Sequence, residues 1–112
     1  MNITPSLPLA VFHILVALAP GERHGYAIMQ EVAERTSGRV RLGPGSLYGS
    51  IKRMLEQGLI EEVRPPARSG DDERRRYYRL TKTGRRAAEA EAARLDEIVR
   101  GARAHGLLPD RG

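Results

Sequence analysis

The sequence predicts a mainly α-helical protein with one small β-hairpin, and three observations support this class. Three segments between residues 7 and 57 carry apolar side chains at helical spacing and are joined by short connections rich in glycine and proline. Two strand-like runs then flank a turn-rich segment at 65–72. A last segment, from residue 81 onwards, carries an apolar heptad pattern. This order predicts a domain at 1–80, followed by a helix and tail at 81–112.

The composition of the 112 residues limits what the chain can be. The length suits one domain with a short arm. The absence of cysteine excludes a disulfide framework, a thiolate metal site and a cysteine nucleophile, and it favours a cytoplasmic protein. No stretch approaches the roughly 20 apolar residues of a membrane span. The apolar run at 7–19 lacks the preceding basic segment of a signal peptide.

The net charge of +5 is concentrated in one part of the chain. Residues 64–86 hold nine basic and three acidic side chains, a net of +6, so the remainder sums to −1. A local basic patch is typical of a surface that binds a polyanion such as DNA. The alternative is a charged loop that only faces water.

The first predicted helix begins near Pro5 and ends at Leu18 or Ala19. Ser6 is expected to cap it, with Pro8 in the first turn. Its sequence is apolar on almost every side, which indicates burial against its own domain and against a partner subunit. His13 within it is interpreted as a buried, hydrogen-bonded histidine, because no second ligand-type residue stands at helical spacing. The side chains of this helix expected at a dimer interface are Leu7, Val11, Ile14 and Leu15.

The second predicted helix covers residues 26–36, after a break at Pro20 and Gly21. Gly38 is a suitable left-handed C-cap for it. The link at 39–43 has valine and leucine with an arginine between them, so a very short strand is considered there.

The third predicted helix begins at Pro44 and ends at Gly58, and it combines two patterns. The apolar side chains that recur at helical spacing are Leu47, Ile51, Met54 and Leu55. The other side is small, polar or basic: Ser46, Gly49 and Arg53, flanked by Tyr48, Ser50 and Lys52. A helix with these two faces could lie in the major groove of DNA. On periodicity alone, an ordinary amphipathic surface helix is the more common structure.

A β-hairpin is predicted next, with strands at 59–64 and 74–80. In the second strand, Tyr78 and Leu80 are expected to face the core. Arg75, Tyr77 and Arg79 then face outwards. The arginines expected to contact DNA from this hairpin are Arg74, Arg75, Arg76 and Arg79.

The last predicted helix begins after Thr81 as its cap and ends at His105 and Gly106. Its heptad seam, expected to pair with a second copy of the chain, consists of Ala88, Ala92, Leu95, Val99 and Ala102. Asp96 and Arg100 stand four residues apart, which favours a side that faces water. The alternative is that this helix packs back onto its own domain.

Three helices followed by a two-stranded wing form the layout of a winged helix-turn-helix, in which the third helix reads the major groove. The helix at 45–57 and the wing at 64–80 are therefore the predicted DNA-binding elements. No catalytic residue, metal or cofactor is predicted, since His13, His24 and His105 lack ligand spacing. A winged helix that binds another protein and an RNA-binding domain remain alternatives.

Several short motifs in this order resemble the PadR family of bacterial transcriptional regulators. They are His24-Gly25-Tyr26, Gly45-Ser46-Leu47-Tyr48, Leu55-Glu56-Gln57-Gly58-Leu59-Ile60, and Tyr77-Tyr78-Arg79-Leu80-Thr81 with Gly84. Together they span about residues 7–86. The chain departs from the family at Gly49, where a proline is common. Glycine lowers helix stability by up to about 1 kcal/mol relative to alanine, and it leaves room for close approach to DNA.

The resemblance implies a homodimer held by the first and last helices, which represses its target promoter. It also implies release by a small aromatic or drug-like effector bound near the dimer interface. The short C-terminal helix is similar to that of the family's smaller subgroup.

Overall fold

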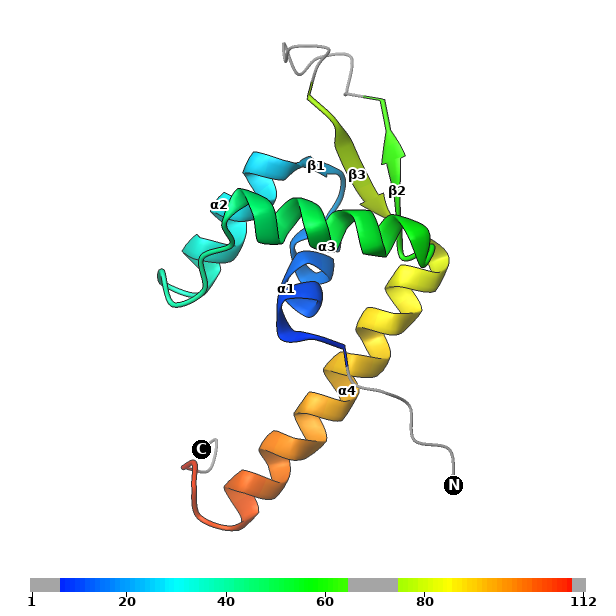
Figure 1. Cartoon of the computed structure of the whole chain (residues 1–112). Helices are drawn as coiled ribbons and strands as arrows, with labels where there is room; N and C mark the ends of the chain where they lie inside the picture. Colours follow the sequence, from blue (N-terminus) through cyan, green and yellow to red (C-terminus); the bar gives the residue numbers. More distant parts are fainter. Residues whose placement is uncertain (1–6, 65–74, 110–112) are drawn as a thin grey trace.

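The computed structural model describes residues 7–64 and 75–109, which form four helices and a small antiparallel sheet (Figure 1). The helices are α1 (Leu9–Leu18), α2 (Gly25–Arg35), α3 (Pro44–Glu56) and α4 (Lys82–Ala104). The strands are β1 (Arg23–His24), β2 (Ile60–Val63) and β3 (Tyr77–Leu80), in the order β1-β3-β2. The predicted class, mainly α with a small hairpin, is confirmed. Within the described residues, no helix is both long and apolar enough to cross a bilayer.

Helix α1 lies at the centre of the domain and contacts α2, α3, β3 and α4. Its buried side chains, which head the hydrophobic core, are Val11, Ile14, Leu15, Ala17 and Leu18. The prediction that Val11 and Ile14 face a partner subunit is therefore wrong, because the chain's own elements cover them. Leu15 is also buried in one copy, but it lines a groove at the surface, so its place at an interface stays a prediction. The helix also begins at Leu9, later than expected, and Pro8 rather than Ser6 occupies the N-cap position. Ser6 itself lies outside the described residues.

Helix α2 has the expected position and both expected ends. The Nδ1 atom of His24 accepts a hydrogen bond from the Ala27 backbone N–H at 3.1 Å, which caps the first turn. At the other end, the Gly38 N–H donates to the Ala33 carbonyl at 2.7 Å, with Gly38 at a φ of +78°. A glycine suits this left-handed position because it has no Cβ.

The sheet differs from the prediction in one strand. The link at 39–43 forms no strand; instead the Thr36 hydroxyl accepts a hydrogen bond from the Val40 N–H at 3.0 Å. The third strand is Arg23–His24, which pairs with the edge of β3 that β2 leaves open. A strand of two residues has no periodicity in the sequence, so the pattern gave no signal for it.

Strand β3 is covered on both faces, which corrects the expected exposure of Tyr77. Tyr78 joins the hydrophobic core, as predicted. Tyr77 is also buried, and its ring meets the ring of His24 edge to face, with centroids 5.3 Å apart. An alternation rule assigns one face of a strand to water, but β1 brings His24 over that face.

Helix α3 buries the apolar stripe that the sequence predicts, except at its end. Leu47, Ile51 and Met54 are 2% exposed or less. Leu55 is 38% exposed, so its assignment to the buried stripe is wrong. It lies in the last turn, where the chain turns away through Gly58 into β2.

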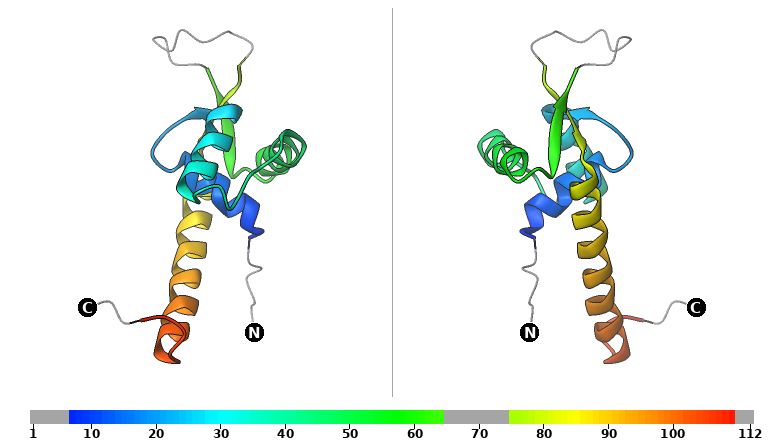
Figure 2. Two further views of the ribbon diagram at one scale, coloured as in Figure 1. Left: turned by 90° about the vertical axis from the view of Figure 1, so that its left-hand side faces the viewer. Right: turned by 90° about the vertical axis from the view of Figure 1, so that its right-hand side faces the viewer.

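Helix α4 packs on the domain only with its first part, and the remainder projects away (Figures 1 and 2). Its 23 residues span roughly 35 Å. The radius of gyration is 15.9 Å, whereas a compact domain of this length has about 13 Å. The alternative that α4 folds back on its own domain is therefore correct only for its N-terminal part.

Glu91 marks the point where α4 leaves the domain. Its carboxylate is buried and forms an ion pair with Arg94 at 2.6 Å. The hydrogen bonds from Arg94 lower the pKa of Glu91, and the Leu7 backbone N–H contributes to the same shift. This carboxylate thus connects α4 to the segment that leads into α1.

The start of α4 lies against the start of β2 with no room for a side chain at Gly84. The Thr81 hydroxyl accepts a hydrogen bond from the Gly84 N–H at 3.0 Å, and the Thr81 N–H donates to the Leu59 carbonyl at 3.1 Å. A Cβ atom on Gly84 would lie 1.8 Å from that carbonyl oxygen. The backbone of β2 or α4 would have to move to accommodate it.

We expect Gly84→Ala to lower the free energy of unfolding by about 1–3 kcal/mol, the usual cost of overpacking. Gly101→Ala is the matched control, because it lies in the same helix and nothing lies within 4 Å of its added Cβ. That change should raise the free energy of unfolding by up to about 1 kcal/mol. Urea denaturation measures both. Equal effects of the two substitutions would contradict the close packing at Gly84.

His13 links α1 to α2 through Arg35. The Arg35 guanidinium approaches His13 Nδ1 at 3.2 Å and donates to the His13 carbonyl at 3.1 Å, while Glu31 accepts from Arg35 at 2.8 Å. Burial and the positive charge of Arg35 lower the pKa of His13, against the smaller opposite effect of Glu31. The folded state therefore favours the neutral imidazole.

Because its pKa is lower in the folded state, His13 should make the protein less stable as the pH falls. The unfolded chain binds this proton more readily, so the loss begins near the ordinary histidine pKa of about 6.5 and continues below it. Unfolding free energies at pH 7.5 and pH 5 should differ more for the unsubstituted protein than for His13→Gln. An equal difference in the two proteins would contradict this assignment.

Candidate nucleic-acid interface

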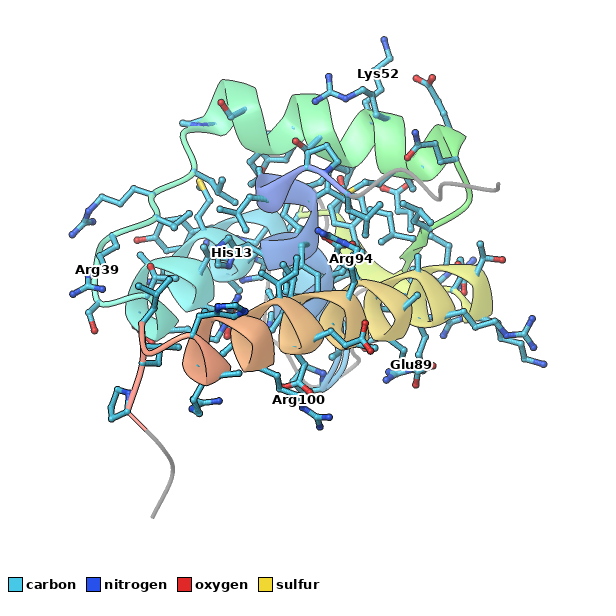
Figure 3. The ribbon with its side chains drawn as sticks, turned by 90° about the horizontal axis from the view of Figure 1, so that it is seen from below. His13, Arg39, Lys52, Glu89, Arg94 and Arg100 are labelled. Carbon is cyan, nitrogen blue, oxygen red and sulfur yellow. The ribbon has the colours of Figure 1, made fainter. Side chains whose placement is uncertain are left out.

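The outer side of α3 presents polar and basic side chains to water. Ser46, Lys52 and Arg53 are exposed, and Lys52 points away from α1 (Figure 3). A Cβ atom at Gly49 would meet only the Arg53 guanidinium, at 3.9 Å, so the surface there is open. The buried stripe of Leu47, Ile51 and Met54 fixes this orientation.

Ser50 does not belong to that surface. It is only 4% exposed, so its assignment as a DNA-binding residue is wrong. It stands three residues after Leu47 and four before Met54, and this spacing places it on the same side of the helix as these two buried residues. Its small side chain gave no sign of burial in the sequence.

Two of the wing arginines form ion pairs with the neighbouring strand. Arg79 lies 2.6 Å from Glu61, its partner in the strand register, and Arg76 lies 3.5 Å from Glu62. All four side chains are substantially exposed. Exposed pairs contribute about 0–1 kcal/mol, so these arginines can exchange a carboxylate for a phosphate at little cost. Arg74, also predicted to bind DNA, lies outside the described residues.

Arg75 reaches from the wing to the start of α2. Its Nη1 atom lies 3.0 Å from His24 Nε2. Since His24 caps α2 with its other ring nitrogen, this contact places a guanidinium beside the positive end of that helix. The sequence predicted Arg75 for the wing but gave no indication of its neighbour.

A concave region, here called the wing hollow, lies between the start of α2, helix α3 and the wing. It measures about 580 Å³ and is lined by His24, Gly25, Tyr26, Tyr48, Arg75, Arg76 and Tyr78. Gly25 lets Tyr48 lie close to α2, because a Cβ there would come 2.5 Å from the Tyr48 hydroxyl. Of these residues, the sequence predicts Tyr48, Arg75 and Arg76 as DNA-binding side chains. It does not predict the contribution of His24, Gly25, Tyr26 and Tyr78. The His-Gly-Tyr motif was the available signal.

A second, apolar groove lies between α1 and α4. It measures about 180 Å³ and is lined by Phe12, Leu15, Val16, Ala19, Leu80, Arg85, Ala88, Glu89 and Ala92. Of the predicted dimer seam, Ala88 packs partly on the core, Ala92 lines this groove, and Val99 is 40% exposed. Leu95 and Ala102 are half-buried. Ile98, which the heptad omitted, is also exposed on this helix.

The described residues do not bring three histidine or acidic side chains together as a metal site would. The candidate interface presents hydroxyls, cations and one helix start, which are groups that bind phosphate and base edges.

Comparison with known proteins identifies one family. The model of the transcriptional regulator PadR-like family matches residues 14–90. The chain is 34% identical over 88 residues to the transcriptional regulator Rv3488 of Mycobacterium tuberculosis, a match that covers 79% of this chain and 77% of that protein. It is 47% identical over 79 residues to an uncharacterized 37.1 kDa protein in transposon TN4556 of Streptomyces fradiae. That match covers 70% of this chain but only 21% of the longer relative.

Solved structures agree with the fold. A PadR family transcription regulator from Clostridium difficile matches with a TM-score of 0.75 and 26% identity, over 88% of this chain and 98% of that one. Bacillus subtilis PadR in complex with operator DNA matches with a TM-score of 0.64 and 22% identity, over 74% and 46% of the two chains. The second match is a likeness of fold alone.

Proposed function

The chain belongs to the PadR-like family of transcriptional regulators, and we propose that it acts as a homodimeric, DNA-binding repressor that a small molecule releases from its operator. Residues 1–80 would form the DNA-binding domain, and residues 81–112 the dimerisation helix and tail. Such a regulator would act on the chromosome, in the cytoplasm of a bacterium.

One observation carries the DNA-binding part of this proposal. The core fixes α3 so that Ser46, Gly49 and Arg53 face outwards together, with the cationic wing beside them. A helix with this outer side fits the major groove, where arginine and lysine pair with guanine. The other side chains proposed to contact DNA are Tyr48, Lys52, Arg75, Arg76 and Arg79. The complex of Bacillus subtilis PadR with operator DNA, which shares this fold, supports the same use of it.

The dimer part rests on the exposed apolar side of α4. In one copy of the chain, Ile98 and Val99 are 54% and 40% exposed, on the segment that projects from the domain. The exposed apolar strip continues from the groove between α1 and α4, so a second α4 packed along it would cover both. The proposed contacts are Ala92, Leu95, Ile98, Val99 and Ala102, with Leu7 and Phe12 from the segment around α1. A palindromic operator would follow from the two-fold symmetry.

The effector part rests on the same groove. Its lining is almost wholly apolar, and the Glu89 carboxylate at its edge could pair with a cation. A second subunit would cover its open side. Arg85 is held by the Ala19 carbonyl, to which it donates at 3.0 Å. A small aromatic or drug-like effector fits such a site. Bordetella bronchiseptica BpsR has a similar fold, and its solved structure addresses how 6-hydroxynicotinic acid regulates its DNA binding. This likeness supports an aromatic effector.

The DNA-binding part is tested by selecting genomic fragments with the purified protein and measuring affinity for them. Arg53→Ala should lower affinity by about 1–3 kcal/mol and relax the preference at one base pair, since it removes a base-edge contact. Arg100→Ala, at the far end of α4, is the charge-matched control and should bind like the unsubstituted protein. If Arg53→Ala and Arg100→Ala behave alike, or structured RNA competes as well as duplex DNA, α3 does not read DNA.

The dimer part is tested by placing a charge on the exposed apolar side of α4. Val99→Asp should dissociate the dimer at micromolar concentration, because a carboxylate would be buried between two copies. It should not unfold the chain, since Val99 contacts water in one copy. Ala93→Asp is the matched control and should remain dimeric, because Ala93 is exposed and stands seven residues before Arg100, on the same side of α4 and outside the proposed contacts. Sedimentation velocity measures both; identical masses would contradict the proposed interface.

A further inference from the structure

We propose that the wing hollow is a phosphate site that takes one backbone phosphate of the bound duplex and thereby fixes the register of α3 in the groove. This inference rests on the proposed DNA-binding function, but it concerns other residues than the outer side of α3.

The charge of the hollow is positive on two sides. Arg75 and Arg76 approach from the wing, and the first turn of α2 approaches from the opposite wall with Gly25 and Tyr26. The unpaired N–H groups and the dipole at a helix start attract anions. Arginine matches the geometry of a phosphate with two parallel donors. Glu62 lies near this wall, but it is exposed and its contact with Arg76 is 3.5 Å long.

The Tyr78 hydroxyl gives the independent indication of a ligand. Tyr78 is 96% buried, as its exposed fraction of 4% shows. Its backbone pairs within the sheet, but among the described residues no group forms a hydrogen bond with its hydroxyl. Within that part of the chain, no polar side-chain atom that is fully shut off from solvent lacks a partner. The Tyr78 hydroxyl must therefore reach solvent, and the space that Tyr78 lines is the wing hollow.

The chemistry of this hydroxyl suits an anion. Burial raises the pKa of Tyr78, with a further contribution from the Glu62 carboxylate, so the group remains a protonated donor. The Tyr48 hydroxyl lines the same hollow and is a second donor of this kind. Two phenols, two guanidiniums and a helix start thus surround one space, and all of these groups can donate hydrogen bonds to a phosphate.

The size of the hollow favours a phosphate that belongs to a nucleic acid chain. At about 580 Å³, the space is much larger than a free phosphate ion needs, and it accommodates a segment of sugar and phosphate. Two of its walls come from α3 and the wing, which meet DNA in the proposed complex, and the third comes from the start of α2. A phosphate held there would fix the position of α3 without adding sequence preference.

The test compares two substitutions in the full-length protein. Tyr78→Phe removes only the hydroxyl, and because that group has no partner among the described residues, the unfolding free energy should not fall. We expect affinity for the selected operator and for an unrelated duplex to fall by the same factor, roughly tenfold, as for a lost hydrogen bond to a charged group. Arg75→Gln should weaken both duplexes equally and reduce the slope of log affinity against log salt by about one.

A duplex series with one neutral methylphosphonate per molecule identifies the phosphate. When the methylphosphonate stands at the contacted position, the unsubstituted protein and Tyr78→Phe should bind that duplex equally well. The charged phosphate to which the Tyr78 hydroxyl would donate is then absent. Inorganic phosphate, titrated into the labelled protein, should shift the amide signals of Gly25 and Tyr26, and less so in Tyr78→Phe.

Two results would overturn the site. The first is that Tyr78→Phe binds DNA as tightly as the unsubstituted protein while Arg53→Ala binds more weakly. That result would leave the proposed function intact but show that the wing hollow takes no part in DNA binding. The other is a phosphate titration that shifts the Gly25 and Tyr26 amides while neither substitution changes DNA affinity, which would assign the hollow to a free anion. If the unsubstituted protein does not bind duplex DNA at all, the proposed function itself is wrong.

Discussion

The burial of α1 is the constraint on which the rest of the structure depends. Helix α1 is the most apolar segment of the chain, and α2, α3, β3 and the start of α4 all contact it. In a domain this small, one helix that is apolar on nearly every side leaves the others a single way to cover it. Each of them turns its apolar stripe inwards, and its polar side is thereby assigned to solvent. The packing of α3 on α1 therefore determines which side of α3 faces solvent.

The same constraint decides where a second copy can bind. Because Val11 and Ile14 are buried within the chain, the apolar surface that α1 offers a partner is limited to other positions, such as the exposed Leu9 and the Phe12 that lines the groove. Further exposed apolar side chains, Ile98 and Val99, lie on the projecting part of α4, beyond the buried Glu91. The sequence alone could not separate these two cases, since an apolar helix at a core and one at an interface have the same pattern. Only the count of elements packed on α1 distinguishes them.

Features with a local cause were predictable from the sequence, and features that depend on distant neighbours were not. The start of α3 at Pro44, the left-handed Gly38 and the Thr81 cap each follow from one residue type at one position. The short motifs that identify the family are local in the same sense. In contrast, β1 exists because β3 has a second edge, and the burial of Tyr77 follows from β1. The wing hollow combines segments more than 50 residues apart, so no window of sequence contains it.

The acidic side chains of the wing also have a physical consequence for DNA binding. Glu61 and Glu62 hold Arg79 and Arg76 across the strands, which reduces the net charge of the hairpin before any nucleic acid arrives. Because these pairs are exposed, each contributes little to stability, but together they restrict the rotamers of the arginines. A phosphate that replaces a carboxylate then meets a guanidinium that is already extended. In the proposed complex, these acidic residues would reduce the non-specific attraction of the wing for polyanions, so α3 would contribute a larger share of the binding free energy.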